Sequence, residues 1–261
     1  MPLIFNTIEV VSIIAMRLSE FVSLLEEIAP PEGALDLDEG RIGLVLDRGG
    51  DVERVAVSLD PTDHVLSEAG RIGADLLITH HTLFFDPLTR ISQTLSSSLK
   101  IALLSDLSLY VMHTNLDRAP GGINDVLAEI LGLRDVEACE IGRIGEIKTP
   151  CELEDFATLV SERLETHVRW VGDGIVERVM VVGGSGFGRE YIDMACEMNA
   201  DVLVSGELRH SSIRYAQARG LSLIDATHYA TENPGMKRLS ERLPIETVFI
   251  DDEPIVGVRE R

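Results

Sequence analysis

The sequence predicts an α/β protein with two similar lobes, each built on a mixed, largely parallel sheet. Short apolar runs alternate with helical segments along the chain, which is the pattern of parallel strands joined by helices. The order of these runs in the first half recurs in the second half. The chain has 261 residues, which is enough for one large core or for two lobes.

The first lobe is predicted over residues 16–132. A helix is expected from Met16, because its apolar residues recur at helical spacing, and Pro30 and Pro31 end it. Short apolar runs and longer amphipathic segments then alternate. Strands are expected over residues 41–46, 52–59, 75–79 and 107–112, and helices over residues 61–72, 95–106 and 123–131.

Three segments of the second half match segments of the first half in the same order. Buried strands resemble one another because they use the same residues, but here polar residues recur as well, which favours two related lobes. The matched pairs are residues 178–184 with 54–58, residues 200–205 with 74–79, and residues 221–226 with 107–112.

The remaining segments complete this organisation. A linker is expected within residues 133–151, at the start of a second lobe that spans residues 133–240. The C-terminal segment, residues 241–261, contains an apolar run over 247–250 that is expected to return to the first lobe as a strand. Residues 1–15 lack the basic segment of a signal peptide, so we interpret them as an extension upstream of a natural start at Met16.

Composition excludes several classes of function. The net charge is -21, from 44 acidic and 23 basic residues, so the chain repels nucleic acid phosphates and is not expected to bind nucleic acid. No stretch approaches the roughly 20 apolar residues of a membrane helix, so no membrane contact is expected. The three cysteines are an odd number without close spacing, which indicates free thiols in a reducing cytoplasm.

His80 and His81 directly follow the strand predicted over residues 75–79. Ligands bind at the carboxyl ends of strands in open parallel sheets, and imidazole is a common ligand of Zn, Fe, Ni and Cu. Neighbouring residues on a continuing strand point to opposite faces, so both histidines reach one site only if the chain turns there. A site that holds two metal ions would accommodate both histidines as ligands. The alternative is a pair of surface histidines at a strand end.

Each half also carries a histidine followed four residues later by a carboxylate, after its last matched strand. These pairs are His113 with Asp117, and His228 with Glu232. Positions i and i+4 of a helix share a face, so an imidazole and a carboxylate converge, and a carboxylate can bridge two cations. His113 could bind metal, orient a ligand or transfer protons. Taken singly, these segments are also compatible with a strand end before a turn and with a helix surface.

Together, the three segments predict a catalytic metal site. Three histidines and two carboxylates leave coordination positions open for water or substrate, as catalytic sites require. The predicted ligands are His80, His81, Asp117, His228 and Glu232.

Two further segments are ambiguous. Residues 183–188 (GGSGFG) form either a tight strand-to-helix turn or a phosphate-binding loop, although they match neither a P-loop nor GxGxxG. Residues 205–210 (SGELRH) occupy the place in the second half that THH occupies in the first. Glu207 and His210 are therefore candidates for orienting a ligand or contacting substrate. His64 and His167 have no such context and are interpreted as ordinary histidines.

The motifs THHTLFF, HTNLD, SGELRH and THYATE, in this order, resemble those of the NGG-interacting-factor-three-like (Nif-three-like) family, often called GTP cyclohydrolase 1 type 2. The resemblance runs from about Met16 to near the C-terminus. It implies a dinuclear metal site in the cleft between two lobes, and it places the family's ligands on the five residues named above. It also implies a homo-oligomer, commonly a ring-shaped homohexamer.

This chain departs from the family pattern in two places. The family's early Asn-Val-Gly-Leu element reads GRIGL here, over residues 40–44. The long insertion that some members carry between the lobes is absent, so any function that resides in it is missing.

The sequence thus predicts a metal-dependent hydrolase with two divalent ions per chain (Zn, Fe, Mn, Ni or Mg) and with His113 or His210 transferring a proton. Its expected partners are a small-molecule substrate, such as a nucleotide, and further copies of the chain. Opening of the purine ring of GTP follows only from the family resemblance, because a fold does not establish a function. The alternative is a non-enzymatic metal-binding or regulatory scaffold.

Overall fold

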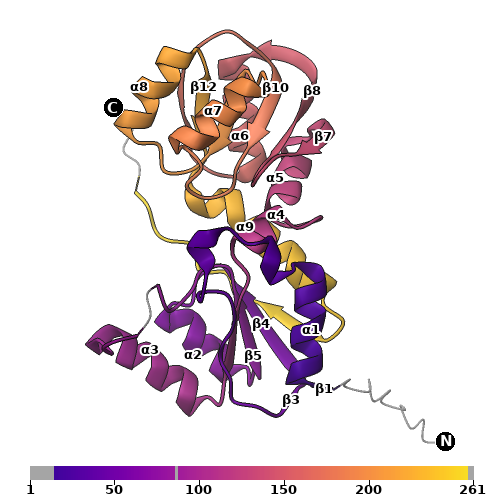
Figure 1. The fold of residues 1–261 in the computed structure, drawn as a ribbon, viewed down its shortest axis with the longest axis vertical. Helices are drawn as coiled ribbons and strands as arrows, with labels where there is room; N and C mark the ends of the chain where they lie inside the picture. Colours follow the sequence, from indigo (N-terminus) through magenta and orange to yellow (C-terminus); the bar gives the residue numbers. More distant parts are fainter. Residues whose placement is uncertain (1–14, 86–87, 258–261) are drawn as a thin grey trace, which may run out of the picture.

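The computed structural model describes residues 15–85 and 88–257, which form two α/β lobes stacked along the long axis of the molecule (Figure 1). The first lobe contains a five-stranded sheet in the order β13-β4-β5-β6-β2. All neighbouring strands in it are parallel except β2, which is antiparallel to β6. The strands are Glu246–Phe249 (β13), Arg54–Ser58 (β4), Leu76–Thr79 (β5), Ser108–Val111 (β6) and Gly43–Leu46 (β2).

The second lobe contains a six-stranded sheet in the order β7-β8-β10-β11-β12-β9. Its strands are Arg134–Ala138 (β7), Arg143–Glu152 (β8), Ile175–Val181 (β10), Val202–Ser205 (β11), Ser222–Asp225 (β12) and Arg169–Val171 (β9). Strands β10, β11 and β12 are parallel neighbours like β4, β5 and β6, and β9 is antiparallel to β12 as β2 is to β6. The prediction of two similar lobes with mixed sheets is therefore confirmed. The first sheet is largely parallel, whereas in the second sheet the pairs β7–β8, β8–β10 and β12–β9 are antiparallel.

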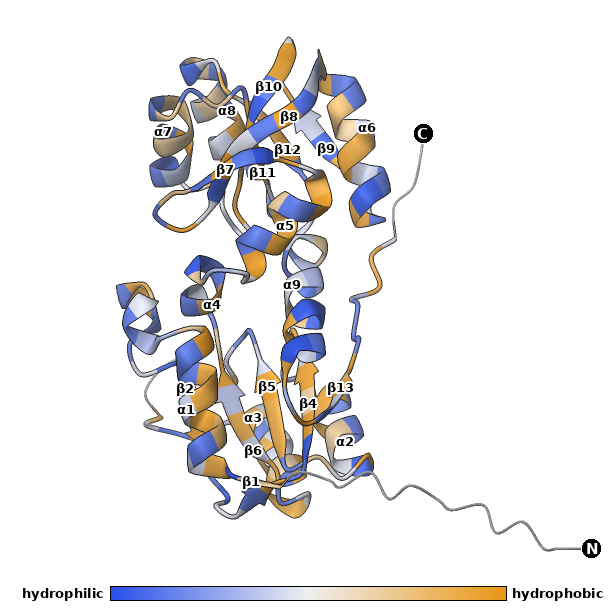
Figure 2. Cartoon of the chain, turned by 90° about the vertical axis from the view of Figure 1, so that its right-hand side faces the viewer, coloured by the Kyte–Doolittle hydropathy of each residue, from blue (hydrophilic) through white to orange (hydrophobic). Residues whose placement is uncertain are grey.

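Helices cover both faces of each sheet, and the apolar strands lie between them (Figure 2). The first sheet packs against α1 and α9 on one face and against α2 and α3 on the other. The second sheet packs against α5 and α6 on one face and against α7 and α8 on the other. These helices are Leu18–Ile28 (α1), Asp63–Arg71 (α2), Gln93–Leu104 (α3), Ile123–Leu131 (α5), Leu153–Leu164 (α6), Arg189–Glu197 (α7), His210–Arg219 (α8) and His228–Arg242 (α9).

Packed helices carry the chain between the lobes in both directions. It leaves the first sheet after β6 through the short helix Thr114–Arg118 (α4) and enters the second lobe through α5. It returns through α9, which packs against both α5 and β4. The following strand, β13, lies parallel to β4 at the edge of the first sheet. The two lobes are thus joined by packed helices as well as by the chain itself.

Two segments differ from the sequence predictions. The first helix begins at Leu18 rather than Met16, because Met16–Arg17 (β1) pairs with Asp51–Val52 (β3) in a two-stranded sheet. Residues 133–151, expected as a linker, instead form β7 and most of β8. All five residues of β7 are exposed, so this edge strand lacks the alternation that would reveal it. The predicted extension lies outside the described residues except for Ala15.

No helix in the described ranges combines the length and the apolar character that crossing a membrane requires.

Candidate metal centre

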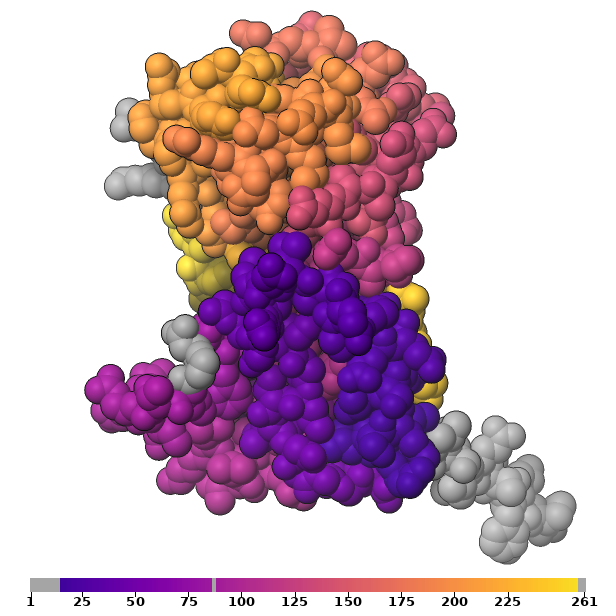
Figure 3. All heavy atoms as spheres, in the orientation of Figure 1, coloured from indigo at the N-terminus to yellow at the C-terminus, as the bar shows by residue number. Residues whose placement is uncertain are grey.

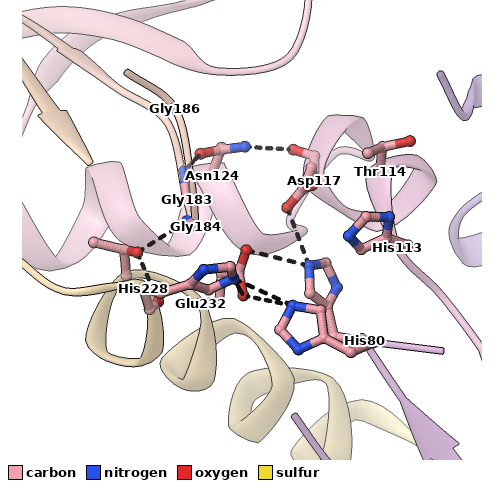
Figure 4. Close-up of polar contacts among 12 residues, drawn as sticks. His80, His113, Thr114, Asp117, Asn124, Gly183, Gly184, Gly186, His228 and Glu232 are labelled. Carbon is pink, nitrogen blue, oxygen red and sulfur yellow. Dashed lines mark hydrogen bonds and ion pairs between the residues drawn. The ribbon is translucent and has the colours of Figure 1, made fainter. Parts of the chain in front are cut away.

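The loops that follow the parallel strands of the two sheets meet at the junction of the lobes (Figure 4). His80 and His81 follow β5, and Asp117 lies in α4 after β6. His228 and Glu232 lie in the first two turns of α9, after β12. His81 Nε2 is 3.2 Å from His228 Nε2, so residues 147 positions apart are in direct contact. The structure thus brings together all five residues that the sequence singles out as metal ligands.

These five side chains form two groups of three that share Glu232. One group is His80, Asp117 and Glu232, and the other is His81, His228 and Glu232. Within each group the ligand atoms lie within 4.8 Å of one another.

The interatomic distances fit one metal ion in each group. Glu232 Oε1 is 3.5 Å from His80 Nε2, and Glu232 Oε2 is 3.3 Å from His81 Nε2 and 2.9 Å from His228 Nε2. Two ligand atoms that each lie about 2.1 Å from one tetrahedral ion are about 3.4 Å apart. The two oxygens of Glu232 therefore face different histidines at separations that coordination can bridge.

The buried charges of the cluster attract cations. Asp117 and Glu232 are only 4% and 3% exposed. Burial and the charge of Glu232 raise the pKa of Asp117 to about 8. Burial opposes protonation of His81, but hydrogen bonds to Asp60 and Glu232 outweigh it and raise its pKa to about 10. Both shifts show that this site favours added positive charge.

Three buried atoms of the cluster also lack the hydrogen bonds that buried polar atoms normally make. His80 Nε2, Asp117 Oδ1 and Glu232 Oε2 have no hydrogen-bond partner among the described residues. His80 Nε2 and Asp117 Oδ1 are 3.7 Å apart and belong to the same group of three. A nitrogen lone pair and a carboxylate oxygen left unsatisfied at this distance fit the ligand set of a divalent cation.

Every histidine at the junction is oriented by an acceptor on its Nδ1. The acceptors are the Met112 carbonyl for His80 (2.8 Å), Asp60 for His81 (2.7 Å), Glu207 for His228 (2.8 Å) and Asp38 for His113 (2.7 Å). When Nδ1 donates to such an acceptor, Nε2 carries the lone pair that binds a metal. The four Nε2 atoms are thereby fixed for coordination or proton transfer.

Replacing Asp60 with asparagine is expected to weaken metal binding by about 10- to 100-fold, because the carboxylate orients His81 and increases its basicity. Competition with a chelating dye would measure the affinity. Asp173→Asn is the matched control, since Asp173 is exposed in the loop between β9 and β10. Equal affinities of the two variants would contradict the role of Asp60.

A turn after β5 lets neighbouring histidines serve one cluster. The backbone N–H groups of His80 and His81 both donate to the Leu59 carbonyl, at 3.1 and 3.0 Å. The Thr79 hydroxyl donates to the His81 carbonyl at 2.7 Å. The chain therefore turns at the point where a continuing strand would send the two imidazoles to opposite faces.

The glycine-rich segment after β10 forms a close turn against α9. Its first two amides are already bonded: Gly183 N–H donates to Asn124 Oδ1 at 2.8 Å and Gly184 N–H donates to Thr231 Oγ1 at 3.0 Å. Gly184 has a φ of +68°, and a Cβ there would lie 2.1 Å from Glu232 Oε1. Glycine is needed because the backbone passes directly over the cluster. These amides are not free to cradle a phosphate.

The two histidines predicted to transfer protons lie in different places. The His113 ring centre is 4.9 Å from that of His80, and His113 forms a third group of three with His80 and His81. His210 is the exposed first residue of α8, and among the described residues it has no polar contact with the cluster. The structure thus brings His113, but not His210, to the cluster.

A segment of the first lobe covers one side of the cluster. Residues 30–42 include the 3₁₀ turns Pro31–Gly33 (η1) and Asp36–Asp38 (η2), and they reach the second lobe (Figure 3). Leu35 packs against the core of the second lobe, and its N–H donates to Thr114 Oγ1 at 2.8 Å. Leu35 and Leu37 of this segment also line a cavity that ends at Asp117 and Glu232.

Two cavities reach the cluster from outside. One, of about 180 Å³, is lined by Leu37 and Tyr191 and ends at Asp117, His228 and Glu232. The other, of about 390 Å³, is lined by Leu83 and Phe85 and ends at His81 and His228. A small molecule therefore has access to both groups of ligands, and both routes carry apolar walls.

Comparison with known proteins agrees with the family resemblance. A model of the Duf34/NIF3 (NGG1p interacting factor 3) family matches residues 16–254. Proteins named GTP cyclohydrolase 1 type 2 homolog are 32% identical in Methanocaldococcus jannaschii, covering 90% of this chain and 100% of that one, and 34% identical in Pyrococcus abyssi, covering 90% and 98%.

Solved structures agree with these relatives. Reduced HcgD from Methanocaldococcus jannaschii has a TM-score of 0.81 at 32% identity, covering 91% of this chain and 98% of that one. A Bacillus cereus protein related to NIF3 has a TM-score of 0.84 at 22% identity, covering 93% and 99%, and shows the same fold. With its paired ligand groups between two matched lobes, the chain belongs to the Duf34/NIF3 family.

Proposed function

We propose that this protein is a metal-dependent hydrolase that holds two divalent ions and acts on a small molecule. The observation that carries the proposal is the sharing of Glu232 between two groups of three metal-competent residues. A carboxylate shared in this way holds two cations at the spacing that two-metal hydrolytic sites use. The proposed ligands are His80, His81, Asp117, His228 and Glu232.

The residues around the ligands have distinct roles in this proposal. When bound, a pair of divalent cations would supply Lewis acidity that activates water and polarises the scissile group. Asp38 holds His113 Nδ1 at 2.7 Å, so His113 Nε2 is free to accept or return a proton at the cluster. The two cavities would admit the substrate, and Leu35 would form part of the wall of one of them.

The relatives guide the choice of substrates and assembly. Their printed name, GTP cyclohydrolase 1 type 2 homolog, supports including nucleotides among the molecules tested. A cytoplasmic location and a homo-oligomer, up to a homohexamer, belong to the same proposal. Moderate salt favours such an assembly, because a net charge of -21 per chain causes repulsion between copies. Light scattering would measure its mass.

Turnover by metal-loaded protein tests the proposal against a non-enzymatic scaffold. We expect hydrolysis of at least one member of a panel of nucleotides and esters, and a loss of about 100-fold or more in the His81→Ala variant, which lacks one ligand. His64→Ala is the control, because His64 lies in α2 away from the cluster. Metal binding without turnover across the panel would favour the scaffold.

A further inference from the structure

A further cavity, distinct from the two that reach the cluster, is lined mainly by polar residues. Its volume is about 320 Å³, and its walls come from the loop after β10, the starts of α7 and α8, and Glu207. Ser185 lines both this cavity and the one that ends at Glu232. Glu207 accepts a hydrogen bond from His228 Nδ1. A molecule bound in this cavity would therefore extend toward the metal ligands.

Two arginines line this cavity, together with Glu190 and Glu207. Arg189 makes no ion pair among the described residues, and its guanidinium lies 5.0 Å from the centre of the Tyr215 ring. Arg209 approaches Glu207 only at 3.7 Å, with its own side chain 73% exposed. In a chain with 44 acidic and 23 basic residues, an arginine that faces a cavity without a carboxylate partner indicates an anion from outside.

The other polar groups of the cavity favour a ligand that carries hydroxyl groups as well as a negative charge. Glu190 and Glu207 also line the cavity, and their charges oppose a simple inorganic ion. Carboxylates accept hydrogen bonds from sugar hydroxyls, as they do from ribose in dinucleotide sites. Ser185 and Ser211 add hydroxyl groups that can donate or accept. The combination of arginines, carboxylates and serines fits a ligand that carries both a phosphate and hydroxyl groups.

We propose that this cavity binds a phosphorylated sugar, either free or as part of a mononucleotide, with its phosphate on Arg189 and Arg209. Its hydroxyl groups would lie against Glu190 and the serines. The volume is within the range of small-molecule sites. This inference names a substrate class and so rests on the proposed function for the reacting centre, but the binding itself is measurable without turnover.

Calorimetric titration of metal-loaded full-length protein tests the site. The probes are ribose 5-phosphate, a purine mononucleoside monophosphate, inorganic phosphate and ribose. We expect both phosphorylated sugars to bind more tightly than either inorganic phosphate or ribose. If the mononucleotide binds better than ribose 5-phosphate, the source is a nucleotide, and equal affinities indicate the sugar phosphate. No binding of either at millimolar concentration would overturn the proposal.

Variants of the residues that line the cavity test whether this binding occurs there. Arg189→Gln and Arg209→Gln should each weaken binding of ribose 5-phosphate by about 10-fold or more, since each loses a charge-assisted contact. Glu190→Gln should weaken binding of ribose 5-phosphate but not of inorganic phosphate. Arg214→Gln is the control, because Arg214 lies on α8 outside the cavity and bonds Gln217. Affinities unchanged in both cavity arginine variants, with unchanged melting temperatures, would refute the site.

The two proposals fail in different ways. His81→Ala should lose turnover and keep its affinity for ribose 5-phosphate, because His81 does not line this cavity. Binding that survives without any turnover by the wild type would remove the hydrolase but leave the phosphate site. Metal content should stay unchanged in the arginine variants, since neither side chain can ligate a cation.

Discussion

Replacing Glu232 with glutamine is expected to reduce bound metal from about two ions per chain to nearly none. Glu232 belongs to both groups of three, and its two oxygens face different histidines. Burial opposes its ionisation, but the neighbouring histidines of the cluster hold its pKa well below the usual value. The neutral amide would remove this charge from both ions at once. Elemental analysis of protein purified without chelator would measure the loss.

Single-ligand variants provide the comparison for this result. His80→Ala and His81→Ala each remove a ligand from one group, so each should retain about one ion per chain. His64→Ala should retain full occupancy, because His64 is outside the cluster. If Glu232→Gln kept its metal while His64→Ala lost it, the proposed ligand set would be wrong.

Replacing Gly184 with alanine should also abolish or severely reduce metal binding, although glycine ligates nothing. A Cβ at Gly184 would lie 2.1 Å from Glu232 Oε1 and 3.1 Å from His228 Nε2. The buried carboxylate would have to move away, and its displacement would disrupt both groups. Elemental analysis and dye competition would show whether the ions are lost or bound more weakly.

The Gly220→Ala variant distinguishes the effect of this contact from the effect of backbone strain. Its φ of +73° resembles the +68° of Gly184, but a Cβ at Gly220 meets nothing within 4 Å. Alanine costs about 1–2 kcal/mol in the left-handed region at either position. Gly220→Ala should therefore melt at a lower temperature with its metal content unchanged. Equal metal loss in the two variants would point to general destabilisation rather than intrusion into the cluster.

The sequence predicts much of the site because ligands gather at strand ends. His80 and His81 follow β5, and His228 with Glu232 follows β12, so the rule that parallel sheets bind ligands at their carboxyl ends brings them together. The i, i+4 spacing of His228 and Glu232 then places both side chains on one face of α9. Glu207 is also predicted, because its segment occupies the place of THH in the second half.

The residues that orient the ligands are harder to predict. Asp60 follows β4 at a strand end like the others, but Asp60 and Pro61 together read as an ordinary turn. Asp38 lies in a 3₁₀ turn and bonds His113, 75 residues away, with no local pattern to indicate it. Gly184 must be glycine because it packs against α9, which begins more than 40 residues later in the sequence. Such contacts depend on the assembled lobes and not on local spacing.

Because β13 pairs with β4, the sheet of the first lobe cannot be completed until nearly the whole chain has been synthesised. Arg54 and Glu246, which pair across these strands, are separated by 192 residues. A nascent chain that has reached residue 132 has an unpaired edge at β4, lacks the α9 side of its core and carries only His80, His81 and Asp117 of the ligand set. Contacts between residues so far apart in the sequence slow folding. Until β13 is made, the unpaired edge of β4 can pair with other chains. The first lobe is therefore synthesised first, but its sheet and core are completed last.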